Sequence, residues 1–557
     1  MFTELHKTFD TFTERERAIF KGAALVFSVS LILNSANIFY KSTELAPVEG
    51  GIYTEGVVGQ PIALNPLIAG ANEADKDITK LLFSDLTDLM ETHTISADNR
   101  TWTITLKENL TWSDGNKLTS DDIIFTLETV QDPEAHSPQF ATWQGVNAER
   151  LSEREVRFIL KTPYAFFLDN LSNFQIAPQH IFGSIPSANL RLSDYNLEPV
   201  GSGPYKFEEY IKGKDGFITE YKFAVNPNYA DRSPLIKEIR IKFFPSYDAA
   251  IQGFNRREID GLGGLRAQDV SEIKVGYQLK ELIVPRYYAV FLNQNTSLQL
   301  RDDAVREALA LATNRDTIVK DVFEKRAIPV YGPIYPGIEG YESDVADAYP
   351  FSLEKAAELL EKGGWVKGAE GIRTKIVQGS ELSLSFELVV PDIDFLVETA
   401  EILKKDWAEI GVVITPIVLS TQEIAQNAIR TRNYQMLIFG NILKNNPDVF
   451  SFWHSTERFR PGLNLSLYEN SKVDSILEAI RKNFNPESRI TEVKSLQTMI
   501  TNDIPAVFLF APNYLYAAPR QLGGFSASAI PTPSDRFEHV SEWYLKTARV
   551  FNLQSQE

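Results

Sequence analysis

Few residues of this chain have the types and spacing of a catalytic site. Ser352 and Lys355 show the Ser-x-x-Lys spacing of one class of serine hydrolases. The same serine directly precedes an amphipathic segment that starts at Leu353, where a hydroxyl group would cap the first turn of a helix. The Gly-x-Ser-x-Gly, His-Glu-x-x-His and phosphate-loop patterns do not occur in the sequence. We therefore interpret Ser352 as a helix cap, and we predict that the protein is not an enzyme and has no cofactor.

The potential metal ligands of the sequence are not spaced as in known metal-binding motifs either. Asp392 and Asp394 could open a calcium loop, but no glycine follows and the next acids are Glu398 and Glu401. We expect the two aspartates to precede and cap a helix. The six histidines are scattered, and the absence of cysteine excludes disulfides and thiolate sites. We predict no metal site, although the sequence leaves open whether a metal or a metallophore is a ligand.

The composition indicates a large acidic protein with more than one domain. Its 557 residues exceed what one hydrophobic core usually organises. Apolar residues make up 43% of the chain, which is enough for large buried cores. The net charge of −18 argues against nucleic acid as a partner, because binding phosphates needs concentrated Lys and Arg. We expect a monomer.

An uncharged run near the N-terminus predicts export. Residues 22–40 hold no charged side chain and would span roughly 28 Å as a helix, close to the hydrocarbon thickness of a bilayer. Lys and Arg are concentrated in residues 1–21, which favours a cytoplasmic N-terminus. We favour an uncleaved single-pass signal anchor, followed by a tether over residues 41–50. A cleaved signal peptide and a buried helix are the alternatives. In both export cases the globular part is extracellular or periplasmic.

The clearest secondary-structure pattern lies in the first quarter of the chain. Apolar and polar residues alternate from Trp102 to Leu106, which predicts a strand. After a polar turn, Thr119 or Ser120 would cap a helix with acids in its first turn. The string closely resembles the signature of family 5 extracellular solute-binding proteins, the oligopeptide-, dipeptide- and nickel-type receptors of ABC importers. The matching residues are Trp102, Leu106, Lys107, Trp112, Asp114, Gly115, Leu118, Thr119, Asp121, Asp122 and Phe125.

Further segments that resemble this family are spread from about residue 51 to residue 544. Two departures stand out: a segment with Leu-Ala-x-x-Trp is missing before the signature, and Arg257 replaces a usual glycine. The matching segments include Leu64-Asn65-Pro66-Leu67, Gly201-Ser202-Gly203-Pro204-Tyr205, Glu258-Ile259-Asp260 and the aromatic strand from Tyr287 to Asn293.

The resemblance implies an α/β fold: a two-lobed clamshell like that of periplasmic binding proteins, of the large class with an accessory subdomain. One transmembrane helix would precede it. Lobe I would comprise residues 51–74, 196–288 and 508–557, with an accessory subdomain over residues 75–195. Lobe II would comprise residues 289–507. The ligand of such receptors binds between the lobes, which close about the two crossover segments.

In peptide-binding members of the family, the ligand backbone lies as an extra strand between short segments of the two lobes. These segments correspond to residues 71–73 and 437–441. Peptide receptors hold the ligand's α-ammonium group with an aspartate, whereas this chain has Leu443 at that position, followed by Lys444. Losing that carboxylate disfavours a free amino terminus. A shift of the alignment by a residue or two is the alternative explanation.

The resulting hypothesis is a receptor for a blocked, internal or non-peptide solute, with Lys444 available to a negative group. It would deliver a small peptide-like or non-peptide solute to an ABC permease and its ATPase. The alternative is a membrane-anchored sensor or interaction module that kept the fold without a transporter. The candidate ligand-binding residues are Asn72, Glu73, Trp143, Tyr288, Phe439, Gly440, Asn441, Leu443, Lys444, Asp448, Phe510 and Tyr514.

Overall fold

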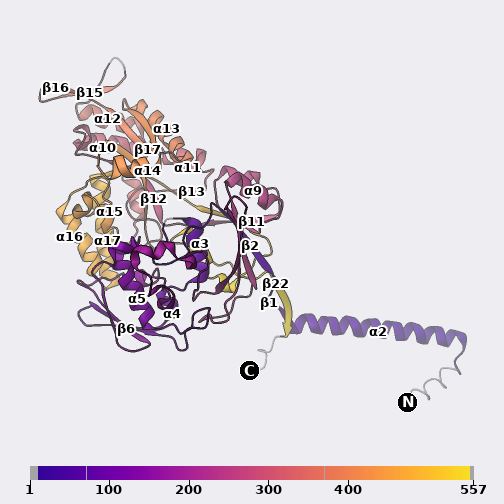
Figure 1. Cartoon of the computed structure of the whole chain (residues 1–557). Helices are drawn as coiled ribbons and strands as arrows, with labels where there is room; N and C mark the ends of the chain where they lie inside the picture. Colours follow the sequence, from indigo (N-terminus) through magenta and orange to yellow (C-terminus); the bar gives the residue numbers. More distant parts are fainter. Residues whose placement is uncertain (1–10, 71, 369–370, 552–557) are drawn as a thin grey trace.

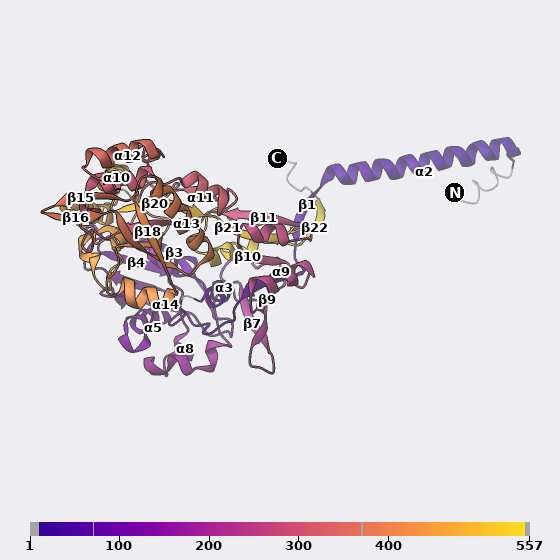
Figure 2. The same cartoon turned by 90° about the horizontal axis from the view of Figure 1, so that it is seen from above.

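The computed structural model describes residues 11–70, 72–368 and 371–551, in which one long helix projects from a globular body (Figure 1). This helix, α2 (Glu14–Ser42), has no buried residue and is long and apolar enough to cross a bilayer. It is a candidate membrane anchor or signal. Strand β1 (Thr43–Val48) follows and pairs antiparallel with the last strand, β22 (Lys546–Phe551) (Figure 2). Most of the segment that we expected as a tether is therefore a paired strand.

A seven-stranded mixed sheet forms the core of the first lobe, in the order β11-β21-β10-β2-β9-β8-β7. Strand β2 pairs in parallel with β9 and β10, and the other pairs are antiparallel. Helix α9 ends at Asn255, and Arg257, two residues later, has a φ of 60°, a conformation that favours glycine. The elements are β2 (Ile52–Val58), α3 (Glu73–Leu82), β7 (Tyr205–Lys212), β8 (Ile218–Val225), β9 (Glu238–Phe244), α9 (Tyr247–Asn255), β10 (Gly261–Leu265), β11 (Tyr277–Leu282) and β21 (Tyr514–Pro519).

A smaller four-stranded antiparallel sheet, β3-β4-β6-β5, lies beside the first lobe. Its helix α5 begins after Thr119, whose side chain accepts a hydrogen bond from the Asp121 amide, so Thr119 is the cap. The elements are α4 (Leu86–Leu89), β3 (Met90–Ile95), β4 (Thr101–Leu106), α5 (Ser120–Gln131), α6 (Phe140–Trp143), β5 (Asn147–Arg150), β6 (Glu155–Ile159), α7 (Phe167–Leu171) and α8 (Gln179–Phe182).

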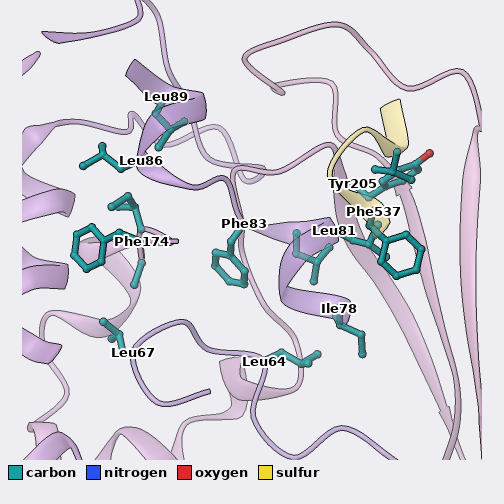
Figure 3. Packing of buried hydrophobic residues seen from close by; sticks show 14 of the residues in the cluster. Leu64, Leu67, Ile78, Leu81, Phe83, Leu86, Leu89, Phe174, Tyr205 and Phe537 are labelled. Atoms are coloured by element: carbon teal, nitrogen blue, oxygen red, sulfur yellow. The ribbon is translucent and has the colours of Figure 1, made fainter. Parts of the chain in front are cut away.

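The end of helix α3 joins these two parts. Its residues Ile78, Leu81 and Phe83 pack between the small subdomain and the large sheet (Figure 3). Gly201 and Gly203 approach it so closely that a Cβ atom at either position would lie 1.9 Å and 2.6 Å from Leu82 backbone atoms. The Gly-Ser-Gly segment is therefore needed for this contact, since any side chain there would clash with backbone.

The second lobe contains a six-stranded mixed sheet in the order β13-β20-β12-β19-β17-β18. Buried apolar side chains cover both of its faces. A three-stranded antiparallel sheet of β14 (Val366–Lys367), β15 (Arg373–Val377) and β16 (Ser380–Ser383) lies at its edge. The strands are β12 (Arg286–Leu292), β13 (Ala327–Pro329), β17 (Ser385–Pro391), β18 (Val413–Leu419), β19 (Met436–Ile442) and β20 (Ala506–Pro512), and the helices are α10 (Asp303–Leu311), α11 (Arg315–Asp321), α12 (Leu353–Lys362), α13 (Asp394–Glu409), α14 (Thr421–Glu423), α15 (Phe450–Trp453), α16 (Ser471–Lys482) and α17 (Pro486–Asp503).

The chain passes between the two large sheets twice. The first passage runs through residues 283–285, between β11 and β12, and the second through Asn513, between β20 and β21. Strand β11 pairs with β21 in one sheet, and β12 pairs with β20 in the other, so the two passages lie side by side. We expected the first lobe to resume at residue 508, but β20 still belongs to the second sheet. The exact lobe boundaries stay predictions.

Candidate functional site

A cavity of about 160 Å³ lies at the double crossover and is lined by both lobes. The first lobe contributes the end of β10 and the loop after it, residues 264–268. The second lobe contributes the ends of α11 and α13, and the crossover itself contributes Arg286 and residues 512–515. A group bound in this cavity would therefore touch both lobes.

Arg266 connects the two walls of this cavity. Its guanidinium group donates to Asp269 in its own lobe at 2.8 Å and to Asp394 Oδ2 in the second lobe at 2.9 Å. Asp394 is the first residue of α13, and the N-cap residue of that helix, Ile393, has no side-chain cap. Asp392 precedes this helix as predicted, but the capping part of the prediction was wrong: the helix has no side-chain cap, and Asp394 accepts from Arg266 of the other lobe instead.

Three side-chain atoms on the cavity wall are buried without a hydrogen-bond partner: Arg286 Nε, Arg326 Nε and Asn513 Oδ1. Arg326 is still compensated by charge, since Glu281 lies 3.4 Å from its Nε and Glu324 accepts from its Nη1 at 2.8 Å. Within the described ranges, no carboxylate lies within 4.0 Å of the Arg286 guanidinium group. The cavity therefore offers unused donors and an unused acceptor.

An aromatic cluster supports the second-lobe side of the cavity. The Tyr288 ring lies 5.2 Å from Phe395 and 5.5 Å from Phe510, and Phe510 lies 4.7 Å from Phe323 (ring centroids). Phe510 is fully buried behind this wall. At Gly440 on the neighbouring strand, a Cβ atom would come 2.8 Å from the Tyr288 ring. The ring of Tyr288 thus fills the space that a side chain at position 440 would need.

On the first-lobe side, the start of α3 faces the cleft. Asn72 caps this helix by accepting from the Ala74 amide at 3.2 Å. The Glu73 side chain is exposed to solvent, but the protein around its carboxyl group removes part of the hydration and raises its pKa. The negative charge of nearby Asp77 raises this pKa further. The positive charges of Lys76, Arg536 and, to a smaller extent, Arg286 lower this pKa.

A buried ion cluster fixes α3 to the first-lobe sheet. Arg536 is 2% exposed and donates to Glu55 Oε1 at 2.8 Å and to Asp77 Oδ1 at 2.8 Å. The hydroxyl group of Tyr516 donates to Glu55 Oε2 at 2.9 Å. Because Asp77 lies one helical turn after Glu73, the cluster also positions the residue that faces the cleft.

A second set of contacts joins the lobes through the accessory sheet region. Lys444 Nζ donates to Asn170 Oδ1 at 2.8 Å, and burial lowers the pKa of Lys444. Tyr164 donates through its hydroxyl group to Asp448 Oδ2 at 2.8 Å, while Arg481 donates to Asp448 Oδ1 at 2.8 Å. A groove of about 550 Å³ runs along these residues. In this structure Lys444 and Asp448 therefore hold the lobes together.

The remaining candidate residues lie away from the crossover cavity. Phe439, Asn441 and Leu443 belong to the apolar layer on the opposite side of β19 or border it, and Asn441 donates to the Tyr287 hydroxyl group at 2.9 Å. Trp143 is 1% exposed and packs 4.2 Å from Phe174 in the accessory core, so it presents no surface to a ligand. Of the candidates, only Tyr514 directly lines the cavity.

The sequence analysis missed the charged and amide residues of the cavity: Arg266, Arg286, Arg326 and Asn513. One signal was available, since Arg286 is a charge directly before the apolar strand at the expected crossover. Ser352 does cap its helix, accepting from the Lys355 amide at 3.2 Å, as predicted. Among the described residues, no group of three potential metal ligands lies close enough to hold an ion.

Comparison with known proteins identifies relatives over most of the chain. Residues 87–459 match the family described as Bacterial extracellular solute-binding proteins, family 5 Middle. The oligopeptide-binding protein AppA of Bacillus subtilis (strain 168) is 26% identical over 556 residues, which cover 94% of this chain and 99% of that protein.

Two solved structures share the fold over their full length. The structure of AppA from Bacillus subtilis in complex with a nonapeptide has a TM-score of 0.71 at 24% identity, covering 90% of this chain and 100% of that chain. The ABC transporter substrate binding protein CtaP from Listeria monocytogenes has a TM-score of 0.76 at 24% identity, covering 89% and 99%. The two-lobed α/β binding-protein fold that we predicted is confirmed by these likenesses.

Proposed function

Because the chain belongs to family 5 of the bacterial extracellular solute-binding proteins, we propose that it closes its two lobes around a solute and presents this form to an ABC importer. Members of the family are the substrate-binding receptors of such importers, not enzymes. The role of this chain is then binding and closure, with the permease and its ATPase as partners.

The observation that carries this proposal is the cavity at the double crossover. Within the described residues, two adjacent passages, residues 283–285 and Asn513, connect the large sheets, so the lobes can rotate about them while both sheets stay intact. The cavity between them has walls from both lobes. A solute that touches both walls binds the closed form better than the open form, and it shifts the population toward closure.

A peptide-like solute is the first candidate, since the relative AppA is named an oligopeptide-binding protein. The contacts at the end of β19 support a solute without a free amino terminus. Leu443 is 2% exposed within the second-lobe core, and Lys444 already contacts Asn170. No carboxylate thus stands at position 443 to hold an ammonium group, and burying that group unpaired would cost several kcal/mol in order of magnitude. We propose a blocked, internal or non-peptide solute.

We further propose that α2 stays attached as a membrane anchor. The contact between its end and the last strand supports this arrangement. The guanidinium group of Arg549 lies 4.2 Å from the Tyr40 ring centroid and donates to the Thr43 carbonyl at 3.2 Å. The Phe39 and Phe551 rings also meet, with centroids 5.9 Å apart. The paired strands β1 and β22 would then hold the receptor next to the external face of the membrane that α2 spans. Mass spectrometry of the membrane-bound protein would find residues 22–40 intact, and a mature protein that lacks them would refute the anchor.

The experiment that tests receptor function measures closure on bound solute. The chain has no cysteine, so Lys214→Cys and Lys405→Cys place one dye on an exposed site of each lobe. Solutes released from the full-length protein are identified by mass spectrometry and added back to solute-free protein in nanodiscs. Energy transfer between the dyes should change with solute concentration. An unchanged transfer signal, while the solute is shown to bind, would refute closure as the output.

A further inference from the structure

The guanidinium group of Arg286 is the least compensated positive charge among the residues that line the crossover cavity. Its Nε is buried without a hydrogen-bond partner, and no side chain of the described residues forms an ion pair with it. More than nine in ten buried polar groups of native proteins have a partner, because an unpaired group keeps its full desolvation cost. A partner outside the described chain would satisfy this group.

The other two arginines that line the cavity already form ion pairs within the protein. Arg266 is held by Asp269 and Asp394, and Arg326 by Glu324 and Glu281. Glu398 also lines the cavity, and the positive charge of Arg286 lowers the pKa of Glu73 in the first lobe. These two carboxylates lower the net positive charge around Arg286, which limits the cavity to one anionic group. The balance therefore suits one anionic group placed at Arg286.

The position of Arg286 in its strand directs it into the cavity. It is the first residue of β12, and side chains of a strand alternate between the two faces, so Arg286 shares a face with Tyr288. Tyr288 contacts Phe395 on that face, and Phe395 lines the cavity together with Phe323. An anion at Arg286 thus has an apolar aromatic wall beside it.

From this geometry we propose that the crossover cavity is a subsite for a single anionic group of the solute, a carboxylate or a phosphate, with Arg286 as its direct partner and Phe323 and Phe395 beside the attached apolar part. The inference rests on the proposed receptor function and specifies the class of solute. The cavity volume of about 160 Å³ is below the roughly 300–1,000 Å³ of a complete small-molecule site. The subsite therefore takes the charged end of a solute, and the remainder extends into the cleft toward Glu73.

The subsite also couples anion binding to closure. Arg286 directly follows the first crossover, and Asn513, with its own unpaired oxygen, forms the second. The opposite wall carries Phe395 and Asp394 from α13 and Arg266 from the first lobe. An anion in contact with Arg286 is enclosed only while these walls are together, so its binding favours the closed form.

Matched pairs of charged and neutral probes test the subsite without knowledge of the solute. Thermal unfolding of the full-length protein in nanodiscs is followed at constant ionic strength with benzoate or benzamide, with N-acetylphenylalanine or its amide, and with phenyl phosphate or phenol. We expect at least one acid to raise the Tm while its neutral partner does not. Arg286→Gln should weaken binding of that acid about thirtyfold or more, because an enclosed charge loses its partner.

Two further variants test whether acid binding depends on the arginine at position 286. Arg232→Gln removes an exposed arginine from the first lobe and should leave acid binding unchanged. Arg286→Lys keeps the charge without the planar fork and should restore part of the affinity. Equal Tm shifts from acid and neutral partners in every pair would overturn the subsite, as would an undiminished acid preference in folded Arg286→Gln.

The closure experiment separates this inference from the proposed function. If Arg286→Gln closes on the released solute with the affinity of the unchanged protein, the subsite is refuted and the receptor function stands. If the acids bind through Arg286 while no solute closes the lobes, the receptor function fails and the subsite stands.

Discussion

The contact between Tyr164 and Asp448 predicts how strongly the lobes hold each other. Tyr164 belongs to the accessory sheet region and Asp448 to the second lobe, and the hydroxyl group donates to the carboxylate at 2.8 Å. The Asp448 side chain is 8% exposed, so water replaces this bond poorly. A hydrogen bond to a charged group contributes roughly 1.5–3 kcal/mol. Because the bond joins the lobes only when they are together, Tyr164→Phe should shift the equilibrium toward the open form by about ten- to hundredfold.

Dye-labelled protein in nanodiscs measures this shift. Without solute, Tyr164→Phe should lower the fraction of closed molecules, and the apparent Kd of the released solute should rise by up to the same factor. Tyr195→Phe is the matched control, because that ring is 43% exposed and lies in the same lobe. Asp448 itself is a poorer target, since Arg481 also depends on it within the second lobe.

Two results would contradict the reasoning. An unchanged closed fraction and Kd in Tyr164→Phe would mean that the contact adds nothing to closure. An equal effect of Tyr195→Phe would mean that the loss of any hydroxyl group in this lobe acts in the same way, and the geometric argument would fail.

Three predictions concern stability, each measured by urea unfolding. Arg536→Met should lower the unfolding free energy by roughly 3–5 kcal/mol, because it leaves buried carboxylates unpaired; a loss under 1 kcal/mol would show that the cluster is dispensable. Burial raises the pKa of Asp85 to about 7 despite its ion pair with Lys80, so the stability contribution of this carboxyl should fall as pH rises from 4 to 7. Asp85→Asn should make the unfolding free energy less dependent on pH between 4 and 7, and an unaltered dependence would refute the attribution of this effect to Asp85. Gly440→Ala should cost roughly 1–3 kcal/mol through its clash with the Tyr288 ring, and combining it with Tyr288→Ala should remove the extra cost.

Much of the fold follows from local sequence signals. Thr119 caps α5, and the Gly-Ser-Gly segment is explained by its close approach to Leu82. The pairing of β1 with β22 could not be predicted in the same way. Thr43 and Phe551 are partners across nearly the whole chain, and neither strand has a buried alternation pattern that indicates a partner. A strand whose residues are mostly exposed leaves little periodic signal in the sequence.

The candidate site shows the same division between local and distant information. The aromatic strand at the crossover was recognisable, and Tyr514 does line the cavity. Trp143, by contrast, is of a residue type that often lines pockets, yet it packs in a core. The sequence does not reveal this, because burial depends on neighbours far along the chain.

The chemistry of the cavity depends on which charges are already paired. Arg266 and Arg286 are the same residue type in neighbouring stretches of sequence. Arg266 contacts Asp394 on a helix more than a hundred residues away, whereas Arg286 has no carboxylate within 4.0 Å among the described residues. A charge that folding leaves unpaired is the one that can serve a ligand, since its desolvation has already occurred and an incoming anion adds the missing interaction. The sequence contains both arginines, but only the fold decides which of them remains available for binding.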